Sequence, residues 1–479
     1  MAEKISMLVL LTVCLLELAA SSVLPKFRDW PSLDTYKKDI DNHTAVANTI
    51  TDYILTGPAK GEVYKRLAIM TDKFGPRLCG SETLEDAIDY MIDQFTQDGL
   101  ENVHKEAVTI PHWVRGHEKA RLITPRSKDL ALLGLGNSIA TPRQGITAAV
   151  LVVQSFDELH ARAAEAEGKI VVYNQVWQNY GQSVQYRSAG ASEAAKVGAV
   201  AALVRSAAAL SIYSPHTGTL SYQNGIPKIP GACITVEDAE LLWRMSQRGE
   251  NITIYLYMEA ETLPNLISYN VIGEIKGSLF PEEVVMVSGH LDSWDVGQGA
   301  MDDGGGAFIS WEALSVVLHL GLRPKRTLRV VLWTCEEMGL WGGIEYFDRH
   351  RKHALNMDIV MESDMGTFTP QGLQLTGTEE AKKITEYLAS TLLNKLNATD
   401  VDDGADLSDV SQWPSLGVPG GSIKVENSRY FYFHHSNGDT MTVQNPDTMD
   451  LCTAVWAVTA YTLADLQFML PANRTVTFN

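Results

Sequence analysis

The sequence predicts an α/β fold, in which a mostly parallel, mixed β-sheet is sandwiched by helices and carries an inserted β-rich lid domain. Two patterns and the length support this prediction. Over 266–479, apolar strand-like runs alternate with helical patterns, which is typical of a parallel sheet covered on both faces. Over 118–265 the apolar runs are shorter and β-rich. A chain of 479 residues is also too long for one ordinary core, so we expect two or three domains.

The sheet domain is expected to begin with residues 44–117, ahead of the insertion. After Gly80, apolar side chains recur at helical spacing, with a capping box at Thr83 and Asp86 and with Gly99 as C-cap. Residues 103–110 then have the pattern of a strand that Pro111 ends. After the insertion, strands are expected at 284–289, 328–333, 358–361 and 418–423, and helices at 303–319, 379–393 and 445–468.

The inserted segment, 118–265, shows no cluster of carboxylates and histidines. Its expected strands are 149–153, 169–173, 199–204 and 232–236, with a helix at 191–197 and another from residue 237. We therefore expect a non-catalytic lid or interaction module on a catalytic scaffold.

The N-terminus has the pattern of a secretory signal peptide, residues 1–20. Its apolar run, Ile5 to Leu16, is too short to cross a bilayer and precedes a group of small residues. Residues 21–43 are polar and unpatterned, and suit either a removable pro-segment or an N-terminal arm. No later run reaches the ~18 apolar residues of a membrane span, so we expect none in the mature protein.

Charge, sequons and cysteines indicate the environment. The formal net charge of −19 argues against nucleic acid or an anionic membrane as a partner. Four N-glycosylation sequons favour a secreted or lysosomal fate, at Asn42, Asn251, Asn397 and Asn473. The cysteines after the signal are few and far apart, so no disulfide framework is expected and Cys335 is interpreted as a small buried side chain.

The residues that carry chemistry stand at strand ends or in loops of 266–479. They are His290, Asp302, Glu336, Glu337, Asp364 and His435. In such sheets ligands bind outside the carboxyl ends of the strands. Imidazole and carboxylate groups without thiolates suit a catalytic zinc site better than a structural one.

The number of candidate ligands favours two metal ions. A single catalytic zinc needs three protein ligands and an open position. Five candidate ligands, one of them able to bridge, suit two ions ~3.5–4 Å apart. Of the adjacent Glu336 and Glu337, one is expected to bind metal and the other to act as general base, although paired glutamates elsewhere are usually solvated.

Neighbouring polar residues have supporting interpretations. Asp292 is expected to orient His290 through the free ring nitrogen of that histidine, and Asp439 to support the metal ligands from a second layer. Asp303 is expected to cap the following helix. Of His434 and His435, one is expected to pack or to face the substrate.

The ordered set His290-x-Asp292, Asp302, Glu336-Glu337, Asp364 and His435 resembles the co-catalytic zinc aminopeptidase and glutamate carboxypeptidase superfamily. Further segments resemble one branch of that superfamily over essentially the whole mature chain, namely 75–78, 110–113, 288–306, 332–334 and 434–440. The resemblance implies a zinc-aminopeptidase-like fold and two Zn²⁺ per chain. It implies that one zinc is held by His290 and Asp364 and the other by Glu337 and His435, with Asp302 as the bridge and Glu336 as general base.

The same resemblance implies hydrolysis of small peptides, with dipeptides that have free termini as the expected substrates. It also implies a homodimer, removal of the pro-segment, and secretion with some lysosomal residence. The alternatives are a non-catalytic receptor-like relative and an aminopeptidase of broader substrate range. A receptor-like relative would have lost ligands, and none is lost. A one-metal glutaminyl cyclase of the same fold would lack the equivalent of His290.

Overall fold

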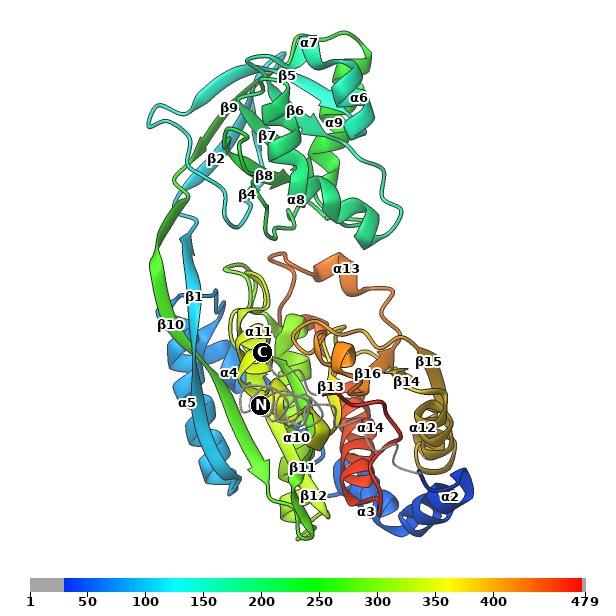
Figure 1. Ribbon diagram of the computed structural model, residues 1–479. Coiled ribbons are helices and arrows are strands. Elements are labelled where there is room, and N and C mark those ends of the chain that lie inside the picture. The colour runs from blue at the N-terminus through cyan, green and yellow to red at the C-terminus, as the bar shows by residue number, and fades with distance from the viewer. Residues whose placement is uncertain (1–29, 476–479) are drawn as a thin grey trace, which may run out of the picture.

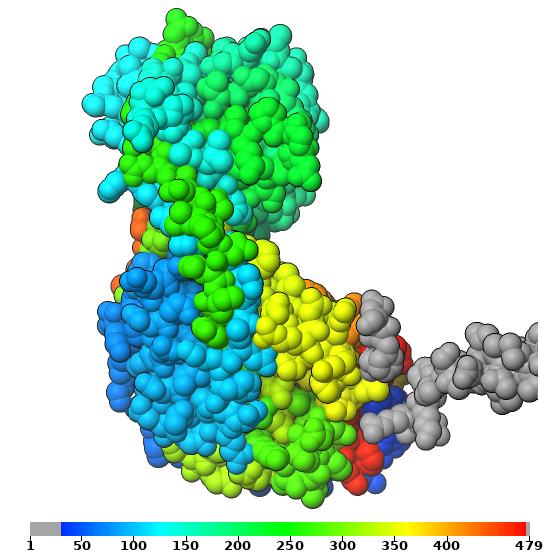
Figure 2. Space-filling view, turned by 60° about the vertical axis from the view of Figure 1, so that its left-hand side comes forward, coloured from blue at the N-terminus to red at the C-terminus, as the bar shows by residue number. Residues whose placement is uncertain are grey.

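The computed structural model describes residues 30–475, which form two lobes joined by a pair of long strands (Figure 1). Strand β1 (Glu101–Val114) leads from the larger lobe to the smaller one, and β10 (Glu261–Ile275) returns beside it as its antiparallel partner. In the space-filling view the molecule narrows between the lobes, where the green segment that contains β10 crosses (Figure 2). The insertion is therefore attached through a two-stranded connection.

The larger lobe is built on an eight-stranded mixed sheet. In spatial order its strands are β1, β10, β12 (Arg326–Trp333), β11 (Phe280–His290), β13 (Met357–Glu362), β16 (Gly420–Val425), β14 (Pro370–Thr376) and β15 (Asp400–Asp403). The central strands β12, β11, β13 and β16 run parallel to one another. Their side chains are almost all buried, as expected for strands covered on both faces.

Helices cover both faces of this sheet. One core contains side chains of α3 (Thr44–Leu55), α4 (Glu62–Phe74), α5 (Glu82–Asp98), α10 (Gly305–His319), α12 (Glu379–Leu392) and α14 (Pro446–Asp465). The opposite core lies under α11 (Trp341–His350) and includes Trp333 and Trp413. The predicted sheet sandwiched by helices is confirmed. It sets the carboxyl ends of the parallel strands at the edge that faces the smaller lobe (Figure 1).

The smaller lobe has its own eight-stranded sheet. In spatial order its strands are β3 (Lys128–Leu130), β2 (Glu118–Thr124), β9 (Thr253–Met258), β5 (Ile146–Val153), β6 (Ile170–Tyr173), β7 (Ala201–Arg205), β8 (Gly231–Ile234) and β4 (Leu132–Gly134). Its helices are α6 (Phe156–Ala161), α7 (Ala163–Ala166), α8 (Tyr180–Lys196) and α9 (Val236–Gln247). Helix α8 begins well before the expected residue 191, because Asn179 caps it by accepting from the Gln182 N–H.

Several local expectations were wrong. Pro111 does not end β1, since β1 is an edge strand and its register shifts between Ile110 and His112, where a missing N–H is tolerated. The N-cap of α5 is Ser81, whose side chain accepts from the Leu84 N–H, whereas Gly99 is the C-cap with φ 86° as predicted.

The N-terminal segment also differs from its expectation. The predicted signal peptide, residues 1–20, lies outside the described residues. Within 21–43, however, helix α2 (Leu33–Asn42) buries Tyr36 and Ile40 and packs against α12, so this part is no unpatterned arm. None of the helices within residues 30–475 is both long and apolar enough to cross a membrane.

Candidate metal centre

Loops at the carboxyl ends of the central strands bring the six candidate residues together. His290 ends β11, and its Nε2 lies 3.3 Å from Asp302 Oδ1 and 3.4 Å from Asp364 Oδ1. On the other side of Asp302, His435 Nε2 lies 3.4 Å from Asp302 Oδ2 and 2.8 Å from Glu337 Oε2. The two oxygens of Asp302 therefore face two different groups of donors.

The hydrogen bonding of these donors fits cations. His290 Nε2, Asp302 Oδ2 and Asp364 Oδ1 are buried and have no hydrogen-bond partner among the described residues. Leaving such atoms without a partner is costly, and a metal ion would satisfy them. The donor atoms of His290, Asp302 and Asp364 all lie within 4.8 Å of one another. So do those of Asp302, His434 and His435, and Asp302 belongs to both sets.

Both histidines of the 434–435 pair lie at this centre. Their rings stack with centroids 3.5 Å apart, and His434 Nε2 is 3.6 Å from Asp302 Oδ2. The close contact with Glu337, however, is made by His435. The geometry is consistent with His435 as the ligand and His434 as its packed neighbour.

Carboxylates behind the centre hold the loops in place. Asp439 accepts from the backbone N–H groups of Ala300, Met301 and Asp302, at 3.1, 2.7 and 3.1 Å. Asp303 accepts from the N–H of His290 and from that of Gly306 in the first turn of α10, both at 3.1 Å. These contacts agree with the supporting and capping roles expected of the two residues.

Asp364 is fixed in a similar way. Its Oδ2 accepts from the Ser408 hydroxyl at 2.9 Å, and the Ser408 N–H donates to Glu362 at 2.7 Å. Ser408 and Glu362 were not singled out from the sequence, because neither has a spacing that marks it.

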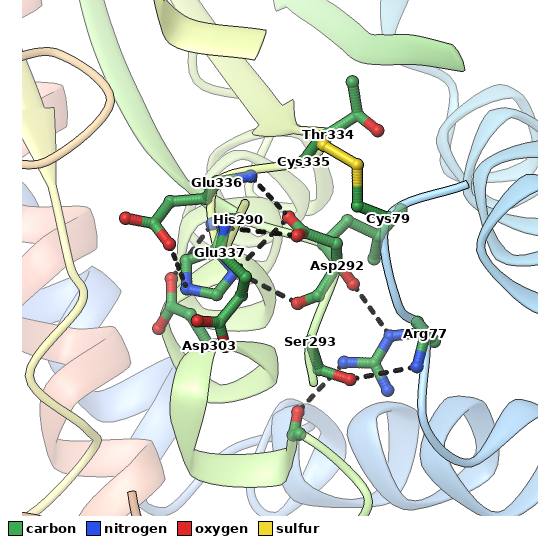
Figure 3. Close-up of polar contacts among 12 residues, drawn as sticks. Arg77, Cys79, His290, Asp292, Ser293, Asp303, Thr334, Cys335, Glu336 and Glu337 are labelled. Carbon is green, nitrogen blue, oxygen red and sulfur yellow. Dashed lines mark hydrogen bonds and ion pairs between the residues drawn. A yellow bond between two sulfur atoms is a disulfide. The ribbon is translucent and has the colours of Figure 1, made fainter. Parts of the chain in front are cut away.

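Asp292 lies at the free ring nitrogen of His290, as expected, and also makes contacts that were not expected. The ring Nδ1 of His290 lies 3.0 Å from the backbone oxygen of Asp292, whereas the carboxylate is farther away, at 3.6 Å (Figure 3). The carboxylate instead accepts from the backbone N–H groups of Glu336 and Glu337, at 2.9 and 3.3 Å. Asp292 thus fixes both the histidine and the turn that carries the two glutamates.

One disulfide beside the centre was not anticipated from the sequence. Cys335, directly before Glu336, is bonded to Cys79, which precedes α5 (Figure 3). The two lie 256 residues apart, so no local pattern signals the pair. Cys335 is buried as expected, but it serves as a crosslink between the glutamate turn and the N-terminal part of the lobe.

Arg77, two residues before Cys79, braces the loop between His290 and Asp302. Its side chain donates to backbone oxygens of that loop and of its own turn, namely those of Leu291, Gln298, Gly299 and Gly75. Burial lowers the pKa of Arg77 to about 10, so the guanidinium remains charged at neutral pH. The loop is therefore held from the N-terminal part of the lobe.

The buried carboxyl groups of the centre lie close together and would be stabilised in their charged form by cations. Burial, together with neighbouring carboxylates, raises the pKa values of Asp302, Glu336 and Glu337. Burial lowers the pKa of His435 well below its ordinary value, with His434 and Arg187 adding to the effect. At His290 burial also acts to lower the pKa, but the carboxylates of Asp292, Asp302 and Asp364 have the larger effect. The pKa of His290 is therefore raised. Divalent cations would relieve the clustering of the carboxylates.

The smaller lobe reaches this centre, which the sequence did not reveal. Thr217 donates its N–H to the His435 oxygen at 2.9 Å, and its own oxygen lies 3.2 Å from His435 Nδ1. His216 Nδ1 lies 2.6 Å from the His434 oxygen. Tyr180 stacks on Phe431 of α13 (Tyr430–Phe433), with ring centroids 4.7 Å apart. The lobe expected to be merely a non-catalytic module therefore positions a candidate ligand.

Nitrogen and oxygen donors around a shared carboxylate, beside the strand ends of an α/β sheet, define the class of the protein as a metallohydrolase. The model of "Peptidase family M28" matches residues 270–460, which include all six candidate residues. The chain belongs to this family of peptidases.

Relatives extend the similarity to nearly the full chain. Carboxypeptidase Q of Homo sapiens is 56% identical over 92% of this chain and 93% of its own length. Carboxypeptidase Q of Xenopus laevis is 54% identical over 98% of this chain and 100% of its own length. The branch resemblance noted in the sequence is thereby confirmed.

Solved structures show the same fold. The crystal structure of a peptidase M28 precursor from Shewanella amazonensis has a TM-score of 0.85 at 33% identity, covering 94% of this chain and 100% of that one. A zinc aminopeptidase from Bacillus subtilis has a TM-score of 0.66 at 18% identity, covering 86% and 99%.

Proposed function

We propose that this protein is a two-zinc exopeptidase that hydrolyses small peptides, and that its substrates are dipeptides with free termini. The observation that carries the proposal is the placement of Asp302 between two sets of donors, with buried atoms in those sets that have no hydrogen-bond partner within residues 30–475. His290 and Asp364 would hold one Zn²⁺, Glu337 and His435 the other, and Asp302 would bridge them. The similarity to carboxypeptidase Q supports the same activity.

The chain's own residues account for the proton transfers. Bound zinc supplies a Lewis acid that polarises the scissile carbonyl and makes water a stronger acid. Glu336 is the general base, with its Oε2 3.9 Å from His290 Nε2, and it takes a proton from the attacking water. It then returns that proton to the leaving amine. Asp292 keeps the backbone of Glu336 fixed while its side chain does this work.

Replacing the base tests the mechanism. We expect Glu336→Gln to lower kcat for a dipeptide by at least roughly 10²-fold, because general-base catalysis commonly contributes that much. Bound zinc, measured by elemental analysis, should stay at the wild-type level, because Glu336 is not among the proposed ligands. Full dipeptide hydrolysis by the zinc-loaded variant would refute the role of Glu336. A wild-type protein without zinc or activity would favour the receptor-like alternative.

We also propose that the insertion acts as a lid, and that the protein is secreted, in part lysosomal, N-glycosylated and homodimeric. All four sequon asparagines, Asn42, Asn251, Asn397 and Asn473, are exposed. The Cys79–Cys335 disulfide suits an oxidising compartment. Enzymatic deglycosylation, light scattering of the secreted protein and N-terminal sequencing test these points. Sequencing would also show whether the proposed pro-segment, with α2 inside it, is removed.

A further inference from the structure

A buried arginine of the smaller lobe lies beside His435 without a counter-charge. Arg187, on α8, is 6% exposed. Its Nη1 donates to the Thr217 oxygen at 3.0 Å, and its Nη2 donates to the Tyr180 hydroxyl at 2.8 Å. Its Nε is buried and has no acceptor among the described residues. Both partners are neutral, so nothing in the described chain balances the guanidinium at close range.

Other buried arginines have a carboxylate partner or several backbone acceptors. Arg115 pairs with Asp295 at 2.6 Å, Arg205 with Glu240 at 2.6 Å, and Arg326 with Glu283 at 2.7 Å. Arg77 has no carboxylate in contact, but its guanidinium donates to four backbone oxygens. Arg187 thus differs in lacking both a carboxylate and a full set of acceptors.

The proton on His435 removes a further possible hydrogen-bond acceptor of Arg187. A histidine that binds metal through Nε2 carries its proton on Nδ1, and that N–H faces the Thr217 oxygen. Arg187 Nη1, 3.4 Å from the same Nδ1, then finds no acceptor there. Among the described residues the guanidinium keeps a free N–H at Nε and one of the two N–H groups on each of Nη1 and Nη2, and the N–H groups of Nε and Nη2 point to the same side. Two adjacent N–H groups of a guanidinium match the two oxygens of a carboxylate.

We propose that Arg187 binds the free C-terminal carboxylate of the peptide, so that the smaller lobe sets the requirement for a free carboxyl end. This inference rests on the proposed peptidase function. One imidazole ring separates Arg187 from Glu337 and Asp302. An extended residue spans only ~3.6 Å, so one residue beyond the scissile carbonyl brings its carboxylate towards the guanidinium.

The test compares a dipeptide with its C-terminal amide as substrates. Wild-type enzyme should prefer the free acid, because the amide cannot pair with a guanidinium. Arg187→Gln should lower kcat/KM for the acid by roughly 10–100-fold, the size expected for a charged hydrogen bond, mostly through KM. It should change kcat/KM for the amide by less than about 3-fold. In Arg187→Gln the ratio of kcat/KM for the acid to kcat/KM for the amide therefore falls towards one.

Controls separate recognition from folding. Arg205→Gln removes a buried arginine of the same lobe that already has a partner, and it should leave the ratio unchanged. Tyr180→Phe keeps the ring but removes an acceptor of Arg187, and it should lower the ratio by a smaller factor than Arg187→Gln does. It replaces Arg187→Gln in the test if that variant fails to fold. Zinc content should match the wild type in every variant.

A binding measurement needs no turnover. Zinc-loaded Glu336→Gln protein, titrated calorimetrically, should bind the dipeptide acid more tightly than its amide, and adding Arg187→Gln should remove the difference. Equal affinity of the Glu336→Gln protein for acid and amide would overturn the assignment, as would equal losses on both substrates in Arg187→Gln. A zinc-loaded wild type that binds the acid selectively but cleaves nothing would instead refute the proposed function alone.

Discussion

Asp292 shows at the residue scale how one carboxylate organises the centre. It lies at the start of the loop that leaves β11, and it holds the backbone of both Glu336 and Glu337 while its own backbone oxygen faces the ring of His290. The ligand candidates were recognisable in the sequence because they lie at the ends of apolar strands or in the loops that precede helices. The partners of Asp292 were not, since they are backbone N–H groups of a distant turn and leave no mark in residue type or spacing.

An amide at this position should disturb the glutamate turn. In Asp292→Asn an NH₂ group would face a backbone N–H that now donates to Oδ1 or Oδ2, so one hydrogen bond is lost. We expect kcat/KM or zinc affinity to fall by roughly 10–100-fold, as is usual for residues that support metal ligands. Zinc titration and dipeptide kinetics measure this, with the exposed Asp348→Asn as control. Wild-type values in Asp292→Asn would show that the turn holds without these bonds.

At the element scale, the turn between β12 and α11 is held in an unusual backbone conformation. Cys335 has φ 59°, a value that residues other than glycine rarely adopt, and the disulfide to Cys79 holds this residue in place. We expect the double variant Cys79→Ser/Cys335→Ser to lose about 2–5 kcal/mol of unfolding free energy and part of kcat. Thermal unfolding with and without reductant measures this, because reductant should affect the wild type and leave the double variant unchanged. Equal sensitivity of both proteins to reductant would contradict it.

Helix α10 carries a buried carboxyl whose ionisation should weaken the fold. Burial raises the pKa of Glu312 to about 7, although Arg66 Nη1 lies 3.1 Å away. At a pH between 4.5, the ordinary pKa of the group, and about 7, Glu312 keeps its proton in the folded protein but has released it in the unfolded chain. The wild type should therefore lose stability relative to Glu312→Gln as pH rises from 5 to 7, by up to about 1.4 kcal/mol per pH unit. Thermal unfolding of both proteins from pH 5 to 7 measures this loss of stability, with the exposed Glu386→Gln as control. The same dependence of stability on pH in the wild type and in Glu312→Gln would contradict the prediction.

On the scale of the whole molecule, the two lobes meet at the metal centre itself. The fold of the larger lobe follows from its alternation of apolar strands and helices, which is a local pattern. The contacts of Arg187, His216 and Thr217 with the 434–435 pair arise only when the lobes dock, and no periodicity encodes docking. A cavity of about 10 Å³ beside Asp302, Glu337 and His435 has room for about one water molecule. We expect a peptide to enter when the lobes separate, with the bend at the narrow connection through β1 and β10 (Figure 2).

The aromatic contact between the lobes should govern that closure. The ring of Phe431 stacks on that of Tyr180, and its centroid lies 5.8 Å from the ring centroid of Trp177. Tyr180 and Trp177 both belong to the smaller lobe. Aromatic pairs contribute about 0.5–1.5 kcal/mol each beyond their buried area, so Phe431→Ala should raise the KM of a dipeptide by roughly 5–100-fold. The matched control is Phe433→Ala on the same segment, whose ring contacts are Tyr432 and Arg429 within that segment. Small-angle scattering of the zinc-loaded protein should show a larger radius of gyration for Phe431→Ala than for Phe433→Ala. If the two variants share one radius and one KM, the stacked pair does not control closure, and the backbone contacts of Thr217 with His435 hold the lobes together.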